Sequence, residues 1–124
     1  MRVLVVDDFP TMRRIIRNVL RQIHVENTLE AENGKEAMEL LRTEEIDLII
    51  CDWIMPEMSG LELLRACKKD AKTSHIPFIM VTAEAAKESV VEAIEAGVDN
   101  YITKPFTSDK LQDAINKATV EATK

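Results

Sequence analysis

Glycine and cysteine are scarce in this sequence of 124 residues, and their scarcity excludes several kinds of site. The glycines, Gly34, Gly60 and Gly97, lie far apart, so the chain has neither the dinucleotide-binding glycine fingerprint nor the Walker phosphate loop. Cys51 and Cys67 form no CxxC pair, and we expect both to be reduced thiols in a cytoplasmic protein. The two histidines have no cysteine at ligand spacing, which disfavours a zinc site.

Long apolar runs and an excess of basic residues are also missing. No apolar run approaches the roughly 18 residues that cross a membrane, and the first run stops at two aspartates, so we expect neither a membrane span nor a signal peptide. Lys and Arg number 16 against 22 Asp and Glu, and the net charge of −6 disfavours a nucleic-acid partner. The length predicts one domain over residues 1–124, and a hydrophobic content of 46% is that of an ordinary globular chain.

The sequence does contain five short strand-like segments that alternate with helical ones. The strands are predicted at residues 3–6, 28–32, 46–51, 78–81 and 100–103. Apolar residues at helical spacing mark the inner face of the first helix: Met12, Ile15, Ile16, Val19, Leu20 and Ile23. The fourth helix is expected from about Ala85 to Ala96, with Gly97 as its left-handed end. Thr107 or Ser108 is expected to cap the last helix.

The alternation of strands and helices predicts an α/β fold with a doubly wound parallel sheet and helices on both faces. Continuous apolar runs, as at 3–6, 48–51 and 78–81, are typical of central strands that are covered on both sides. The segments 28–32 and 100–103 are more polar, so we place them at the edges. A five-stranded order 2-1-3-4-5, which is flavodoxin-like, satisfies this assignment.

Five polar side chains are expected to meet at the carboxyl edge of that sheet. Asp7 and Asp8 follow the first strand, Asp52 ends the third, Thr82 ends the fourth and Lys104 follows the fifth. Ligands bind at this edge where the strand order reverses, which here is between the first and third strands. These residues are therefore predicted to line one cleft.

The chemistry of these five residues points to phosphoryl transfer. Three neighbouring carboxylates repel one another and require a cation or a shared proton, and oxygen ligands without His or Cys suit Mg²⁺. A nucleophilic Asp52, with Mg²⁺, Lys104 and the Thr82 hydroxyl around the phosphoryl oxygens, is the set that transfer to a carboxylate requires. Each residue alone has an ordinary alternative: Asp7 or Asp8 as a helix cap, Asp52 as a loop acid, Thr82 as a cap and Lys104 as a surface charge.

The first helix carries four arginines, and we expect them on its solvated outer face rather than at a nucleic-acid interface, because the chain is acidic overall. They are Arg13, Arg14, Arg17 and Arg21.

The whole chain resembles the receiver domain of two-component response regulators. The matching stretches are Val5-Val6-Asp7-Asp8, Asp52-Trp53-Ile54-Met55-Pro56, Gly60, Val81-Thr82-Ala83 and Lys104-Pro105-Phe106. Within that family the resemblance is greatest to the chemotaxis regulators, through residues 7–14, 60–64, 80–85 and 104–107.

The resemblance implies a role for each matching residue. It makes Asp52 the phosphoacceptor, with Thr82 and Lys104 on the phosphoryl group. Mg²⁺ would be held by Asp7, Asp8, Asp52 and the backbone carbonyl of Ile54. A two-state switch would be formed by Thr82 and Tyr101. The Lys104–Pro105 bond would be cis. Such a protein is a switch that catalyses its own phosphorylation and dephosphorylation, not an enzyme acting on a separate substrate.

Two residues depart from the pattern of the chemotaxis regulators. Ile54 replaces an Asn, and Ser59 replaces an acidic residue before Gly60. Ile54 would flank the phosphoryl group, so we expect it to alter the dephosphorylation rate and any contact with a phosphatase. The backbone ligand at Ile54 is unaffected by the change of side chain.

The resemblance also implies protein partners. The phosphodonor would be a histidine kinase, and the output would be binding of the flagellar motor switch protein through the fourth helix, fifth strand and fifth helix. A phosphatase is a further possible partner, no output domain is expected, and the protein is expected to be a monomer.

Two alternatives remain open at this point. One is a single-domain receiver in another phosphorelay. The other is a Mg²⁺-dependent phosphatase of the haloacid dehalogenase type, which usually has an Asp-x-Asp start and a cap domain. The adjacent Asp7 and Asp8 lack that spacing, and 124 residues leave no room for a cap.

Overall fold

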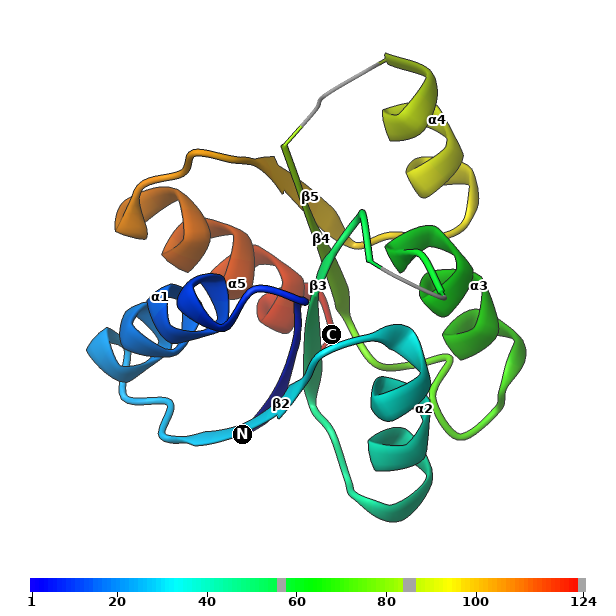
Figure 1. Ribbon diagram of the computed structural model, residues 1–124, viewed down its shortest axis with the longest axis horizontal. Helices are drawn as coiled ribbons and strands as arrows, with labels where there is room; N and C mark the ends of the chain where they lie inside the picture. The colour runs from blue at the N-terminus through cyan, green and yellow to red at the C-terminus, as the bar shows by residue number, and fades with distance from the viewer. Residues whose placement is uncertain (56–57, 84–86, 123–124) are drawn as a thin grey trace.

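The computed structural model has one parallel sheet between two layers of helices (Figure 1). It describes residues 1–55, 58–83 and 87–122. The strands are β1 (Arg2–Val6), β2 (Asn27–Ala31), β3 (Leu48–Asp52), β4 (Phe78–Thr82) and β5 (Asn100–Thr103). The helices are α1 (Pro10–Gln22), α2 (Gly34–Thr43), α3 (Gly60–Lys69), α4 (Lys87–Glu95) and α5 (Ser108–Ala122).

The sheet has the predicted order, β2-β1-β3-β4-β5, and every neighbouring pair is parallel. Helices α1 and α5 cover one face, and α2, α3 and α4 lie on the other (Figure 1). All five residues of β3 and of β4 are buried, whereas β2 and β5 include exposed positions. The prediction that the two polar segments form the edges is confirmed.

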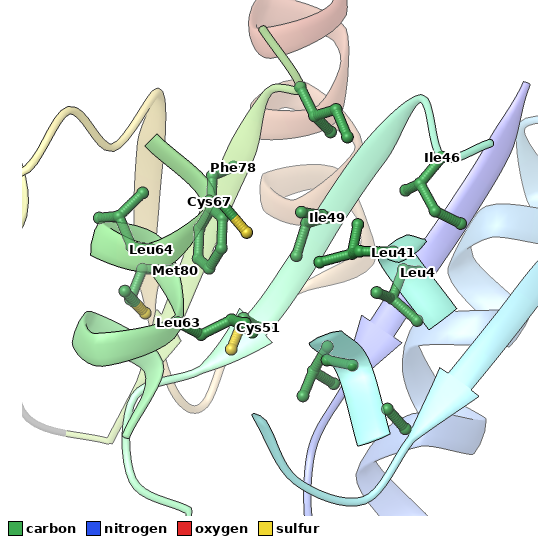
Figure 2. Close-up of a cluster of buried hydrophobic side chains, with 14 of the residues drawn as sticks. Leu4, Leu41, Ile46, Ile49, Cys51, Leu63, Leu64, Cys67, Phe78 and Met80 are labelled. Atoms are coloured by element: carbon green, nitrogen blue, oxygen red, sulfur yellow. The ribbon is translucent and has the colours of Figure 1, made fainter. Parts of the chain in front are cut away.

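Alternate residues of the central strands point into two separate hydrophobic layers. Leu4 and Ile49 pack in the layer of α2 and α3 (Figure 2), and Val5 and Ile50 pack in the layer of α1 and α5. This alternation follows from the two-residue period of a strand. Because both faces of these strands are covered, β1, β3 and β4 each have a run of four consecutive apolar residues, and their polar residues stand at a strand end.

The two cysteines belong to the layer of α2 and α3 (Figure 2). Both are buried and free of disulfides. Burial raises the pKa of the Cys51 thiol well above its usual value, and it raises the pKa of Cys67 to about 11. The two thiols therefore act as small apolar core groups and not as nucleophiles.

The observed helix ends can be compared with those predicted from the sequence. Gly97 has a φ of 95°, which confirms the left-handed end after α4. Thr107 Oγ1 accepts a hydrogen bond from the backbone N–H of Lys110 at 3.2 Å, so Thr107 is the residue that caps α5. The expected start of the fourth helix at Ala85 lies outside the described residues.

The placement of Ile15 in the core is wrong: it is 42% exposed, because it lies at the margin of the apolar stripe of α1. Within the described ranges, no helix is long and apolar enough to cross a membrane.

The C-terminus of α1 places a non-glycine residue in the left-handed region. The backbone N–H of His24 donates to Arg21 O at 3.0 Å and that of Val25 donates to Leu20 O at 2.8 Å, the hydrogen bonds of a Schellman motif. His24 has a φ of 65°, a conformation that costs a residue with a Cβ about 1 kcal/mol.

We therefore expect His24→Gly to raise the free energy of unfolding by about 0.5–1 kcal/mol in urea denaturation. Arg14→Gly, on the exposed face of α1, is the matched control and is expected to lower it by about 0.8 kcal/mol. A lower stability of His24→Gly would show that the imidazole makes contacts that outweigh the backbone strain.

Candidate functional site at the carboxyl edge

The structure brings four of the predicted residues together at the carboxyl edge of the sheet. The Nζ atom of Lys104 lies 3.2 Å from Asp52 Oδ1 and 3.4 Å from Asp7 Oδ2. One carboxylate oxygen from each of Asp7, Asp8 and Asp52 lies within 4.8 Å of the others. These three carboxylates are called the acid cluster below.

Backbone hydrogen bonds fix where each loop leaves the sheet. The N–H of Asp7 donates to Ala31 O at 3.1 Å, and the N–H of Lys104 donates to Thr82 O at 2.7 Å. Both bonds continue the sheet ladder by one residue beyond the strand end. The side chains of Asp7 and Lys104 therefore begin from positions that the sheet itself determines.

The turn after β3 depends on a close approach of two backbone segments. The N–H of Gly60 donates to Trp53 O at 2.8 Å, and a Cβ on Gly60 would lie 2.3 Å from the carbonyl oxygen of Asp52. Ser59 accepts a hydrogen bond from the N–H of Glu62 at 3.2 Å. Ser59, where the family pattern has an acidic residue, thus still supplies an oxygen that caps α3.

Asp52 has an environment that disfavours its charge. Only 6% of Asp52 and 1% of Asp7 is exposed. Burial raises the pKa of Asp52, repulsion from Asp7 raises it further, and Lys104 acts in the opposite direction without cancelling the effect. Added positive charge beside Asp52 would therefore stabilise its ionised form.

The acid cluster fits a hard divalent cation. In the part of the chain that the structure describes, the buried Asp8 Oδ1 has no hydrogen-bond partner. A buried carboxylate oxygen without a partner is costly, and an oxygen-coordinated ion would satisfy it. The donor set contains only oxygen atoms, which matches the preference of Mg²⁺ and not that of zinc.

The remaining predicted residues differ in how deeply they are buried. Thr82 is buried at the end of β4, whereas Ile54 is 67% exposed just beyond Asp52. Tyr101 on β5 is 37% exposed and lines a surface groove of about 380 Å³ with Lys110 and Lys117. Tyr101 pairs with Met80 in the strand register, two residues before Thr82. The Lys104–Pro105 bond is cis, as expected.

The structure also corrects two interpretations of the α1 end of the site. The prediction of a solvated Arg13 is wrong: its side chain is 11% exposed and donates to the Asp7 carbonyl at 2.6 Å and to Glu30 at 3.0 Å. The alternative in which Asp7 or Asp8 caps the helix is not observed, because the N-cap of α1 is Phe9, without a side-chain hydrogen bond. Asp7 Oδ1 instead accepts the N–H of Phe9 at 2.9 Å.

The half-buried Lys104 bridges two members of the acid cluster at the switch point of a 2-1-3-4-5 parallel sheet, which is the arrangement expected from the resemblance to receiver domains of signalling proteins. The family model described as the response regulator receiver domain matches residues 3–116. The chain therefore belongs to the response regulator receiver domain family, whose members are signalling switches rather than enzymes of the usual kind. This assignment removes the haloacid dehalogenase alternative.

Similar proteins carry chemotaxis names. The chain is 47% identical over 117 residues to the chemotaxis protein CheY of Pseudomonas aeruginosa, covering 94% of each chain. It is 44% identical to the chemotaxis protein CheY-3 of Vibrio cholerae, covering 94% of this chain and 90% of that one.

Solved structures agree with the fold. The structure of CheY4 from Vibrio cholerae superposes with a TM-score of 0.87 at 28% identity, covering 94% of this chain and 97% of that chain. A CheY-like receiver domain protein from Methanospirillum hungatei superposes with a TM-score of 0.89 at 29% identity, covering 98% and 95%. The flavodoxin-like fold predicted from the sequence is confirmed.

Proposed function

We propose that this protein is a response regulator that is phosphorylated on Asp52 by a histidine kinase and signals by phosphorylation-dependent protein binding in chemotaxis. The observation that carries the proposal is the Lys104 ammonium, which lies within 3.4 Å of both Asp52 and Asp7 beside a third carboxylate. The chemotaxis assignment is supported by the relative from Pseudomonas aeruginosa, which is similar over nearly its whole length.

Asp52 acts as the nucleophile in this proposal. One of its carboxylate oxygens forms a bond to phosphorus while the bond from phosphorus to the donor's imidazole nitrogen breaks, and the imidazole keeps that electron pair. A bound Mg²⁺ would neutralise charge on the phosphoryl oxygens, and Asp7, Asp8, Asp52 and the carbonyl of Ile54 are the residues that would hold it.

Lys104 and Thr82 complete the phosphoryl site. Lys104 is already within ion-pair distance of Asp52, so it requires no large movement to pair with a phosphoryl oxygen. The hydroxyl of Thr82, at the end of the neighbouring strand, would donate to a second oxygen. We infer that this donation moves Thr82 and frees space for Tyr101, which now lies at the surface.

The partner surface of the proposal is formed by α4, β5 and α5. Val91 and Ile94 of α4 and Tyr101 of β5 are large apolar side chains with substantial exposure, and the groove at Tyr101 is adjacent. The flagellar motor switch protein is the proposed partner there, in the cytoplasm. The exposed Ile54 is the proposed point at which the dephosphorylation rate and contact with a phosphatase differ from those of regulators with an Asn.

Direct phosphorylation tests the chemistry. Incubating the protein with a small acyl phosphate and Mg²⁺ is expected to add one phosphoryl group, measured by intact mass, and a chelator is expected to abolish the addition. A protein that stays unlabelled at millimolar Mg²⁺, although it is folded by circular dichroism, would overturn the proposal.

The choice between chemotaxis and another phosphorelay depends on the partner. The phosphorylated form, and not the unphosphorylated form, is expected to retain purified flagellar motor switch protein. Retention of the motor switch protein by neither form would favour the other phosphorelay, and equal retention by both forms would contradict phosphorylation-dependent binding.

Thr82→Ala separates labelling from signalling. We expect the variant to accept phosphate on Asp52 yet gain little affinity for the motor switch protein, because the hydroxyl that responds to the phosphoryl group is missing. Thr43→Ala, which removes a hydroxyl at the end of α2 and outside the proposed partner surface, is the control and should keep the gain. A gain in Thr82→Ala equal to that of the unaltered protein would exclude Thr82 from the switch.

A further inference from the structure

We propose that Arg13 is a positioning residue that fixes the peptide bond between Asp7 and Asp8, and that Glu30 holds Arg13 in place. The inference rests on the proposed function, in that the acid cluster binds Mg²⁺. Arg13 contacts neither the reacting carboxylate nor a metal ligand atom. Its role would be to set the orientation of the Asp7 and Asp8 side chains.

The contacts of Arg13 form a chain from β2 to the acid cluster. Arg13 Nη1 donates to the carbonyl oxygen of Asp7 at 2.6 Å, and Arg13 Nε donates to Glu30 Oε1 at 3.0 Å. Glu30 also accepts from Arg17 Nη1 at 2.8 Å through its other oxygen. Only 11% of the Arg13 side chain is exposed, so water does not readily replace these bonds.

The carbonyl that Arg13 holds belongs to the peptide unit joining Asp7 to Asp8. The preceding N–H of Asp7 is bonded to Ala31 O at 3.1 Å, and Ala31 is the β2 residue next to Glu30. The backbone of Asp7 is thus fixed on both sides, by the sheet before it and by the guanidinium after it. A charge-assisted bond of this length is stronger than one between neutral groups, and a planar guanidinium holds two acceptors in a set geometry.

Positioning and simple electrostatics predict opposite results when Arg13 is removed. Loss of a positive charge near three carboxylates would by itself strengthen binding of a divalent cation. Loss of a residue that orients two ligands would weaken binding, as removal of a hydrogen-bonded partner behind metal ligands does, by about 10-fold or more. The sign of the change therefore distinguishes the two.

The test is a Mg²⁺ titration of the full chain, measured both by isothermal calorimetry and by the fluorescence emission of Trp53. Trp53 is the one tryptophan in the sequence and adjoins Asp52. We expect Arg13→Met to weaken Mg²⁺ affinity about 10-fold. Arg17→Met is the control, because it removes the same charge and also a bond to Glu30, but that bond lies one step further from the Asp7 carbonyl. The Mg²⁺ affinity of Arg17→Met is expected within about twofold of that of the unaltered chain.

The other outcomes decide against the inference. Unchanged or tighter binding by Arg13→Met, or equal weakening in both methionine variants, would overturn it. If Arg13→Met does not fold, Arg13→Lys is the second variant. It keeps the charge but lacks the planar guanidinium, which reaches Asp7 and Glu30 through two separate nitrogens, so its Mg²⁺ affinity should still fall. An unchanged affinity would overturn the proposal. If the unaltered chain shows no Mg²⁺ binding, the proposed metal site itself is wrong, a result distinct from a failure of Arg13 alone.

Discussion

In a chelating buffer, Asp52→Asn is expected to have a free energy of unfolding larger than that of the unaltered protein by about 1–2 kcal/mol. The fold holds Asp52 beside Asp7 and Asp8, and the unfolded chain does not hold them so close. Asn has nearly the same shape as Asp and lacks the charge, so the variant is relieved of repulsion that Lys104 offsets only in part. Urea denaturation at neutral pH measures the difference.

The pH dependence of this difference follows from the raised pKa of Asp52. The folded protein binds the Asp52 proton more tightly than the unfolded chain, so the free energy of unfolding falls as pH rises from the ordinary carboxyl range through the raised pKa. The amide of the Asp52→Asn variant does not titrate in this range. The advantage of the variant should therefore vanish below the ordinary carboxyl pKa and be complete above the raised one.

Mg²⁺ should reduce or reverse the stability advantage of Asp52→Asn over the unaltered protein. A ligand that binds only the folded state stabilises it by about 2.7 kcal/mol at 100 times its Kd. The Asp52→Asn variant has lost a ligand charge and should gain less. Asp113→Asn, on the exposed face of α5, should change stability by no more than about 0.5 kcal/mol with or without Mg²⁺. Equal Mg²⁺ shifts in Asp52→Asn and the unaltered protein would contradict a metal site at Asp52.

Gly60→Ala is expected to destabilise the protein by about 3 kcal/mol. The new methyl carbon would lie 2.3 Å from the Asp52 carbonyl oxygen and 2.8 Å from the sulfur of Met80. The carbonyl belongs to the backbone of a buried central strand, so it cannot move aside without disturbing β3. Alanine favours a helix more than glycine does, by about 1 kcal/mol, so a stabilised variant would show that the close approach is absent.

Ser59→Ala is the matched control for this substitution. It alters the adjacent residue and removes the hydrogen bond that Ser59 accepts from Glu62, at an expected cost of about 1 kcal/mol. The two variants together separate a steric effect at Gly60 from general sensitivity of the turn. Thermal or urea denaturation of both proteins gives the comparison.

The fold could be predicted because its strands differ in composition. The apolar runs at 3–6 and 78–81 indicate central strands, and the polar segment 100–103 indicates an edge, so few strand orders remained. The position of the acid cluster follows from the same reasoning, since parallel strands bring Asp7, Asp52 and the residue after β5 to one edge.

What the sequence could not predict depends on contacts between elements. The i, i+4 spacing of Arg13 and Arg17 places them on one side of α1 but does not show that Glu30 of β2 faces them. That contact requires the register of β1 against β2 and the angle of α1 on the sheet. Ile15 likewise has helical spacing with the core residues, and only the packing of α1 shows that it lies outside.

Phosphorylation of Asp52→Asn measured by intact mass tests the central claim most directly. The unaltered protein and the Asp113→Asn control are expected to gain one phosphoryl group from a small acyl phosphate in the presence of Mg²⁺. Asp52→Asn is expected to gain none while remaining folded by circular dichroism. Undiminished labelling of Asp52→Asn would show that another residue accepts the phosphoryl group and would contradict the account of this site.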